Sequence, residues 1–329
     1  SHEYNENTGR GVIRCDAAIT KIPADFFSNQ PNVTSVSIPQ SVTNIKSGAF
    51  AGCSLTSFTI PENVTRVESR ALSCETLKLV TVNASKFNYF GGDAFLGCYN
   101  LERFSGPLAS SDGRFLISSN TLLSVAHAGQ SKIEIPENVT TIEGRAFSLA
   151  NLTSIKIPDS VTKLGYGALC GNVNLKSVYL SKNLKEIEEE TFDSCRSLEH
   201  VEIPLGVKKI GNLAFVACEN LKSIEIPSSV EIVEFRAFLE CESLEKVEIK
   251  DGVKILDKES FLCCPKLSKV ILPQSLTEIR NKAFCDCECL EEIEFKRKKK
   301  QWGAIKKQTT WRDSTPLKVV HCSDGDVSI

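Results

Sequence analysis

Apolar positions return at a fixed spacing along most of the chain. Residues 201–230, VEIPLGVKKIGNLAFVACENLKSIEIPSSV, contain their own beginning again, with Val201, Ile203 and Pro204 returning as Ile224, Ile226 and Pro227. From Pro158 onward, the residue that follows the I-x-I pattern recurs every 23 residues, at Pro158, Ser181, Pro204, Pro227, Lys250, Pro273 and Lys296. A period that is kept over so many units indicates stacked structural repeats.

The apolar set of one unit predicts how the units pack. It comprises Ile203, Val207, Ile210, Ala214, Phe215, Cys218, Leu221, Ile224 and Ile226. A lone unit buries too little apolar surface to offset its loss of chain entropy, so successive units must cover one another. The residues Phe192, Phe215, Phe238 and Phe261 are therefore expected to line up in one inner column.

The alternation in S-I-E-I, residues 223–226, predicts a short strand with Ile224 and Ile226 inward and Glu225 outward. Pro227 ends this strand because proline has no N–H for a ladder. The rest of each unit is too short for a full helix with its turns, which favours 3₁₀ or single-turn segments. The predicted fold is a repeat solenoid: a right-handed coil with one parallel ribbon of short strands.

The repeated unit L-x-x-I-x-I-P-x-x-V-x-x-I-x-x-x-A-F-x-x-C resembles that of the BspA-like, treponemal-type leucine-rich repeat family. The resemblance covers about residues 30–322 and recurs in register. It implies a leucine-rich repeat solenoid of the α/β type, found on bacterial surfaces and in some protozoa. The family is described as mediating adhesion to host proteins or to other cells, and the resemblance implies no catalysis.

Breaks in the period divide the chain into four parts. Residues 1–107 form a first array with an irregular N-terminal unit, and residues 131–295 form a regular array. Between them, residues 108–130 carry two apolar runs around Ser119-Asn120, which predicts a β-hairpin insertion, either a structural decoration or a recognition loop. Residues 296–329 form a basic C-terminal segment that contains two tryptophans.

This basic segment has two interpretations. Trp302 and Ile305, three residues apart, can cover the open end of the last repeat and leave the lysines in water. Alternatively, its cations could bind a polyanion such as a heparin-like glycan. The residues concerned are Lys296, Arg297, Lys298, Lys299, Lys300, Lys306 and Lys307.

The fourteen cysteines are interpreted as thiols that fill the core. Seven stand three residues after the Phe position: Cys53, Cys98, Cys195, Cys218, Cys241, Cys264 and Cys287. Stacked positions keep parallel Cα–Cβ vectors about 4.7–4.9 Å apart, which does not suit a disulfide. The run CDCEC at 285–289 lacks the second pair that structural zinc sites use, so no metal is expected. Many free thiols favour an anaerobic habitat or an intracellular location.

The sequence carries no recognisable catalytic motif. Its four histidines have no metal-binding spacing, and no nucleophile elbow, P-loop or dinucleotide fingerprint is present, so we expect neither an enzyme nor a cofactor. The lattice instead predicts a row of outward strand residues as a partner-binding surface, with Tyr179 and Ile271 as exposed apolar anchors; a solvated charged face is the alternative. The candidate residues are Tyr179, His200, Glu202, Glu225, Lys246, Glu248, Lys269, Ile271 and Glu294.

Composition narrows the class of partner. A net charge of -2 gives no general attraction to nucleic acid, and no apolar run approaches the length of a membrane span. We therefore expect a non-enzymatic, secreted or surface-attached protein that binds a protein or glycan partner, such as host extracellular matrix or another cell surface. A glycan-binding protein or an intracellular scaffold is the alternative. The chain contains no Met, so we expect that an N-terminal segment, with any export signal, has been removed.

Overall fold

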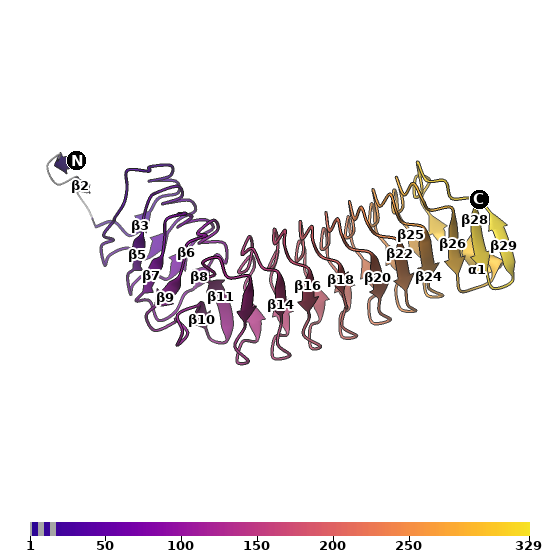
Figure 1. Ribbon diagram of the computed structural model, residues 1–329, viewed down its shortest axis with the longest axis horizontal. Coiled ribbons are helices and arrows are strands. Elements are labelled where there is room, and N and C mark those ends of the chain that lie inside the picture. The colour runs from indigo at the N-terminus through magenta and orange to yellow at the C-terminus, as the bar shows by residue number, and fades with distance from the viewer. Residues whose placement is uncertain (1, 6–9, 14–17) are drawn as a thin grey trace. The chain divides into compact units, whose positions relative to one another are not determined.

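The computed structural model describes residues 2–5, 10–13 and 18–329, and contacts divide the chain into two compact units, Ser1–Leu116 and Ile117–Ile329. Figure 1 shows successive turns of the chain stacked within each unit. The predicted division at residues 107 and 130 stays a prediction. Short strands β1 (His2–Asn5) and β2 (Arg10–Ile13) form an antiparallel pair at the N-terminus.

The I-x-I segments form parallel strands in each unit, and those of the second unit are here called the I-x-I ribbon. The first unit contains β5 (Ser57–Ile60), β7 (Leu79–Val82) and β9 (Arg103–Ser105). The second unit contributes a sheet of β12 (Lys132–Glu134), β14 (Ser154–Lys156), β16 (Ser177–Tyr179) and β18 (His200–Val201). A further sheet contains the parallel strands β20 (Ser223–Ile226), β22 (Lys246–Ile249), β24 (Lys269–Leu272), β26 (Glu292–Phe295) and β28 (Val319–Cys322), and β29 (Gly325–Ser328) pairs antiparallel with β28 at its end.

Pairing in these sheets follows the sequence period. Ser223 pairs with Lys246 and Ile224 with Val247, each 23 residues further along the chain. The burial pattern of β20 alternates, with Ile224 and Ile226 buried and Glu225 exposed. The predicted solenoid with parallel strands is therefore confirmed.

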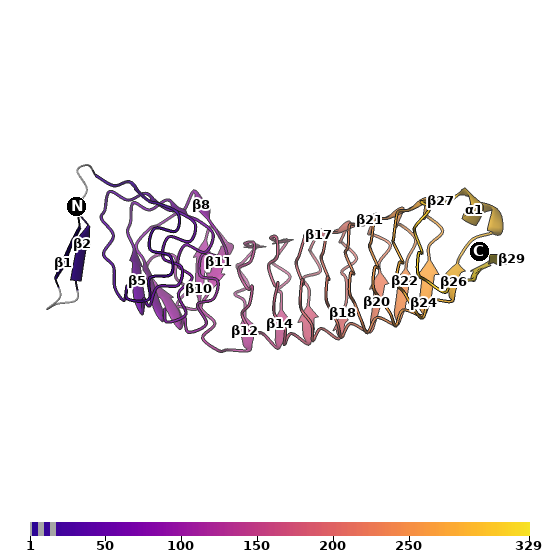
Figure 2. The ribbon, with the colours of Figure 1, turned by 90° about the horizontal axis from the view of Figure 1, so that it is seen from above.

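Each unit also has a second ribbon along its V-x-x-I segments, which the sequence analysis did not predict. Figure 2 shows it on the opposite side of the second unit from the I-x-I ribbon. In the first unit it contains β3 (Lys21–Ile22), β4 (Asn44–Ile45), β6 (Arg66–Val67) and β8 (Tyr89–Phe90). From β10 (Phe115–Ser118) onward it contains β11 (Thr121–Val125), β13 (Thr141–Ile142), β15 (Lys163–Leu164), β17 (Glu186–Ile187), β19 (Lys209–Ile210), β21 (Ile232–Val233), β23 (Ile255–Leu256), β25 (Glu278–Ile279) and β27 (Lys306–Lys307).

The segments around each A-F pair are turns, and no 3₁₀ segment occurs among the described residues. Two residues of such a turn, one on each side of the Phe position, take left-handed backbone angles. Gly48 (φ 63°) and Gly52 (φ 73°) are one such pair, and Leu213 (φ 55°) and Ala217 (φ 53°) are another. A left-handed residue interrupts helical hydrogen bonding, so the expected 3₁₀ segments do not form.

The core of the second unit is a column of phenylalanine rings. Phe192, Phe215, Phe238, Phe261 and Phe284 stack with centroids 5.0–5.3 Å apart, and the planes of neighbouring rings differ by 1–16°. All five side chains are fully buried. The predicted inner column is therefore confirmed, and each turn forms the floor on which the next one packs.

The predicted hairpin around Ser119-Asn120 is present as β10 and β11. Both turn residues have positive φ, 47° and 63°, as the two-residue turns preferred in hairpins require. The second strand then pairs in parallel with β13, Thr121 opposite Thr141. The hairpin therefore supplies a strand of the second ribbon.

The C-terminal end of the stack is covered as predicted. Helix α1 (Lys299–Ala304) buries Trp302, and Trp311 packs edge-on to Phe284 with ring centroids 6.2 Å apart. The two tryptophan rings also contact each other, 6.0 Å apart, and Ile305 is buried beside them. This apolar layer caps the last turn.

Candidate binding site on the strand ribbon

A cavity opens on the I-x-I ribbon between β18 and β20. Its volume is about 470 Å³, and its lining includes His200 and Glu202 from one turn, Glu225 from the next, and Lys246 and Glu248 from the third. Strand pairing is interrupted at this point, because β18 ends one sheet and β20 begins another. The structure thus gathers five of the nine predicted surface residues around one hollow.

The three stacked glutamates have unequal surroundings. Glu248 accepts hydrogen bonds from Lys250 and Lys246, and these bonds lower the pKa of its carboxyl from its usual 4.5 to about 2. The ammonium group of Lys250 also lies 3.2 Å from Glu225, whose side chain remains 62% exposed. Glu202 is exposed and takes part in none of the ion pairs within the described residues. The carboxylate most available to a partner is therefore that of Glu202.

The predicted anchor Ile271 is buried, with 7% of its surface exposed, so its assignment as an exposed contact is wrong. It pairs with Glu248 on one side and Glu294 on the other. Long charged side chains can cover an apolar neighbour with their stems, and Lys246 and Lys250 converge on Glu248 beside it. Lys269 and Glu294 remain exposed on the ribbon and do not line the cavity.

Exposed apolar side chains flank the cavity. Tyr179 is 69% exposed, as predicted, and the β16–β18 register, Ser177 with His200, places it next to Glu202. Leu205, which the sequence analysis did not select, is 78% exposed and lines the cavity. The sequence could have identified Leu205, because it directly follows Pro204, and the other P-x-x-V turns carry a polar or charged residue at this position.

The basic C-terminal run is partly engaged in the fold. Lys306 pairs with Glu278 at 3.0 Å, and Lys296 lies 3.8 Å from Glu248. Lys307 donates hydrogen bonds to the carbonyl oxygens of Trp302 and Ile305, and burial lowers its pKa. Arg297 donates to the carbonyl oxygen of Gln274, whereas Lys298, Lys299 and Lys300 are exposed. The seven cations thus do not form one free patch.

The cysteines of the repeat position have a specific partner. The thiols of Cys218, Cys241, Cys264 and Cys287 each donate a hydrogen bond, at 3.2–3.3 Å, to the carbonyl oxygen of the Phe one turn earlier. Asn172 and Thr315 make the same contact, with Phe147 at 2.8 Å and Phe284 at 2.5 Å. In these turns the buried side chain therefore also acts as a hydrogen-bond donor, which apolar periodicity alone does not reveal, whereas Ala150 occupies the same repeat position without a donor.

The thirteen cysteines of the described part of the chain are free thiols, in agreement with the prediction, and Cys15 lies outside the described residues. Burial raises the pKa of the Cys74 and Cys98 thiols to about 12. These groups are therefore protonated at neutral pH and suited to packing, whereas nucleophilic attack requires the thiolate.

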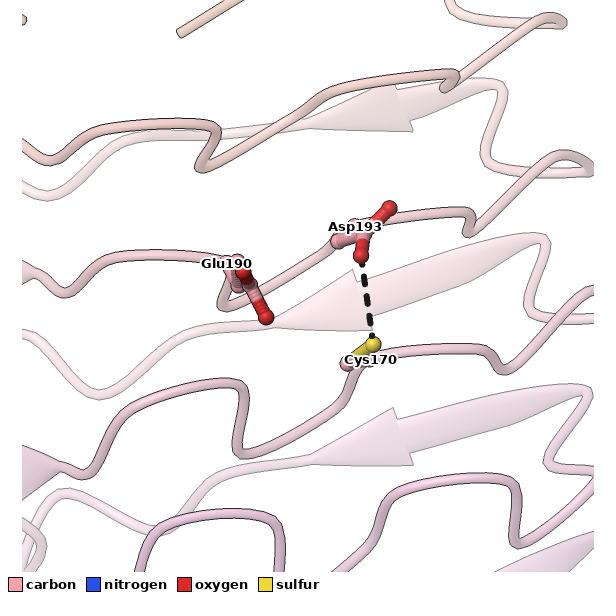
Figure 3. Close-up of side chains that lie close together, drawn as sticks. All are labelled: Cys170, Glu190 and Asp193. Atoms are coloured by element: carbon pink, nitrogen blue, oxygen red, sulfur yellow. Dashed lines mark hydrogen bonds between the residues drawn. The ribbon is translucent and has the colours of Figure 1, made fainter. Parts of the chain in front are cut away.

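Cys170, Glu190 and Asp193 form the one described cluster with metal-like spacing (Figure 3), and its ligand atoms lie within 4.8 Å of one another. Two features oppose cation binding. Arg145 donates a hydrogen bond to Glu190 at 2.8 Å, and burial, followed by the nearby Asp193 charge, raises the pKa of the Cys170 thiol to about 12. The cluster is better explained as a local ion pair with a buried thiol beside it.

Comparison with known proteins identifies the repeat. The family described as BspA type leucine rich repeat region matches residues 12–112, 125–229 and 208–305, which is more than half of the chain. The chain belongs to this family. Among curated proteins, none matches this chain. Within the described residues, none of the helical segments could serve as a membrane span.

Among solved structures, two with TM-scores above 0.5 share the fold. A leucine-rich repeat protein from Eubacterium ventriosum is 22% identical, with a TM-score of 0.59 and coverage of 95% of this chain and 86% of that one. The pneumococcal vaccine antigen PcpA is 18% identical, with a TM-score of 0.56 and coverage of 91% and 66%. A leucine-rich cell surface protein from Faecalibacterium prausnitzii is 26% identical, with a TM-score of 0.45 and coverage of 88% and 60%. The present chain therefore spans only part of the length of two of these proteins.

Proposed function

We propose that this protein is a non-enzymatic binding protein of the cell surface or the extracellular space, which attaches to a protein partner through the I-x-I ribbon of its second unit. The observation that carries the proposal is the cavity at the β18–β20 interruption: Glu202, which forms no ion pair within the described residues, lines it together with the exposed Leu205, and the strand register places the exposed Tyr179 next to Glu202. Protein interfaces concentrate their binding energy in such aromatic and apolar anchors.

The repeat architecture supports this role. The rings of Phe192, Phe215 and Phe238 stack in the three turns that line the cavity, and β20 pairs with β22 beside it, so this part of the ribbon is a rigid surface. A preorganised surface loses little conformational freedom when a partner binds, which favours affinity. The surface location is supported by the description of one structural relative as a cell surface protein and of another as a vaccine antigen.

An array of extracellular-matrix proteins and glycans, probed with the intact chain, tests the proposal. We expect binding to one or more proteins that is lost in the double charge reversal Glu202→Lys/Glu225→Lys. The matched control is Glu189→Lys/Glu242→Lys, which makes the same charge change at two exposed residues outside the cavity. Binding that survives the first variant would refute the ribbon as the contact surface.

The glycan alternative predicts a different result. It requires salt-sensitive retention on heparin that is lost when Lys298, Lys299 and Lys300, the exposed lysines of the C-terminal run, are replaced by Ser. Because Lys296, Lys306 and Lys307 have partners within the fold, the structure favours the ribbon.

A further inference from the structure

The cavity on the I-x-I ribbon combines one kind of charge with an apolar wall. Glu202 and Glu225 come from successive turns, and each presents an exposed carboxylate at the cavity. The third carboxylate, that of Glu248, is already bound by Lys250 and Lys246. Lys250 also lies 3.2 Å from Glu225, so an additional cationic group that enters the cavity is attracted mainly by Glu202 and secondarily by the exposed side of Glu225.

The wall of the cavity adds a second requirement. Leu205 lines it although 78% of its surface is exposed, and Pro227 lines it from the next turn. A ligand that covers Leu205 removes apolar surface from water, which favours binding. A fitting ligand therefore carries a cationic end and an apolar stem.

We propose that this cavity binds an arginine side chain from an extended segment of the protein partner, with its guanidinium on Glu202 and Glu225 and its stem against Leu205 and Pro227. The inference rests on the proposed function, because it specifies which feature of a protein partner this ribbon recognises. The volume of about 470 Å³ falls in the range of ligand pockets, and it accommodates a long side chain with adjoining backbone.

Arginine fits this site better than lysine. Its guanidinium is planar, holds water weakly and donates hydrogen bonds in a fork that can reach two carboxylates. The ammonium group of lysine is compact and strongly hydrated, and this region already has two such groups, those of Lys246 and Lys250, on Glu248. Tyr179, next to Glu202 in the strand register, offers a contact for the residue that flanks the arginine.

Titration of the intact chain with three synthetic nine-residue peptides tests the proposal. The peptides are identical in their leucine and glycine residues and carry a single central arginine, lysine or citrulline, the last being neutral and close in shape to arginine. Dissociation constants are measured by calorimetry and the binding site by NMR. We expect the arginine peptide to bind about tenfold more tightly than the citrulline peptide, and the lysine peptide to fall between them.

Variants locate the interaction. Glu202→Gln and Leu205→Ser should each weaken binding of the arginine peptide, the first by about tenfold, whereas Glu189→Gln should leave it unchanged. Equal binding of the arginine and citrulline peptides, or unchanged binding by Glu202→Gln, would overturn the proposal. Glu202 and Leu205 are both exposed residues. An unchanged thermal unfolding midpoint of each variant shows that its fold is retained.

The array and the peptides separate the two levels of the proposal. If a protein on the array loses binding to the Glu202→Lys/Glu225→Lys variant while the peptides show no preference for arginine, the ribbon stands and the arginine pocket is wrong. If no array protein is sensitive to that variant, the proposed function is wrong, whatever the peptides do.

Discussion

At the residue scale, the cysteine position shows a polar requirement inside an apolar core. Cys241 is fully buried, and its thiol donates to the carbonyl oxygen of Phe215 at 3.3 Å. Cys241→Ala removes this donor and leaves the carbonyl oxygen with the backbone N–H of Cys218 alone, which should lower the free energy of unfolding by about 0.5–1.5 kcal/mol. Cys241→Ser keeps a donor and should cost less. Urea unfolding of both variants makes the comparison, and equal losses would show that the thiol acts only by filling space.

The left-handed corner at Ala217 gives a prediction of opposite sign. Its φ of 53° is strained for a residue with a Cβ atom, whereas glycine adopts it freely. Ala217→Gly should therefore raise the free energy of unfolding by about 0.5–1 kcal/mol, after the entropy of glycine in the unfolded chain is subtracted. The matched control, Ala214→Gly, lies three residues before the same corner at a buried position, where the change should destabilise. A loss of stability in Ala217→Gly would contradict this explanation of the turn.

Single residues also show where sequence reasoning reaches its limit. Period and alternation located Tyr179 and Glu202 on the outer face correctly, because both follow from the register of the repeat. Ile271 occupies the same outward position, yet its surface is covered. Whether an outward residue stays exposed depends on the rotamers of neighbours such as Lys246 and Lys250, which no periodicity encodes.

At the scale of elements, the strand formed by I-x-I could be predicted, whereas the second ribbon could not. A strand such as β19, Lys209–Ile210, has two residues, too few for an alternation to be recognised. Its buried residue, Ile210, was correctly assigned to the core. The cavity could not be predicted either, since it depends on a local interruption between β18 and β20 whose sequences follow the common pattern.

The terminal hairpin β28–β29 yields a pH prediction. His321 on β28 contacts Glu292 of β26 and Asp326 of β29, each at 2.9 Å, and these two hydrogen bonds raise the pKa of His321 above its usual 6.5. Because the pKa of His321 is higher in the folded protein than in the unfolded chain, these two hydrogen bonds contribute to the free energy of unfolding fully below about pH 6.5. This contribution is lost as the pH rises through the pKa of His321 in the folded protein. Thermal unfolding should therefore show that His321→Gln is less stable than the parent chain at pH 5.5, with a smaller difference at pH 9. A difference that grows with pH would contradict the assignment.

At the scale of the whole molecule, a stack of repeats depends on its ends. Each turn of the second unit contacts mainly its neighbours, so an uncovered last turn exposes apolar surface and the loss of structure propagates inward. Trp311 covers Phe284 and is 7% exposed. Trp311→Ala should therefore lower the free energy of unfolding of this unit by about 3–5 kcal/mol. The stability of a distant turn such as that of Phe215 should then depend on a residue almost a hundred positions away.

Hydrogen exchange read by mass spectrometry checks this dependence. In Trp311→Ala, amide protection should be lost most around Phe284 and progressively less toward Phe215, because each turn is stabilised through the next one. The exposed substitution Lys318→Ala, in the same C-terminal segment, is the control and should change protection little. Protection lost only next to residue 311 would mean that each turn is stable independently of the next one. The rigid ribbon on which the proposed binding site depends would then not require the C-terminal cap.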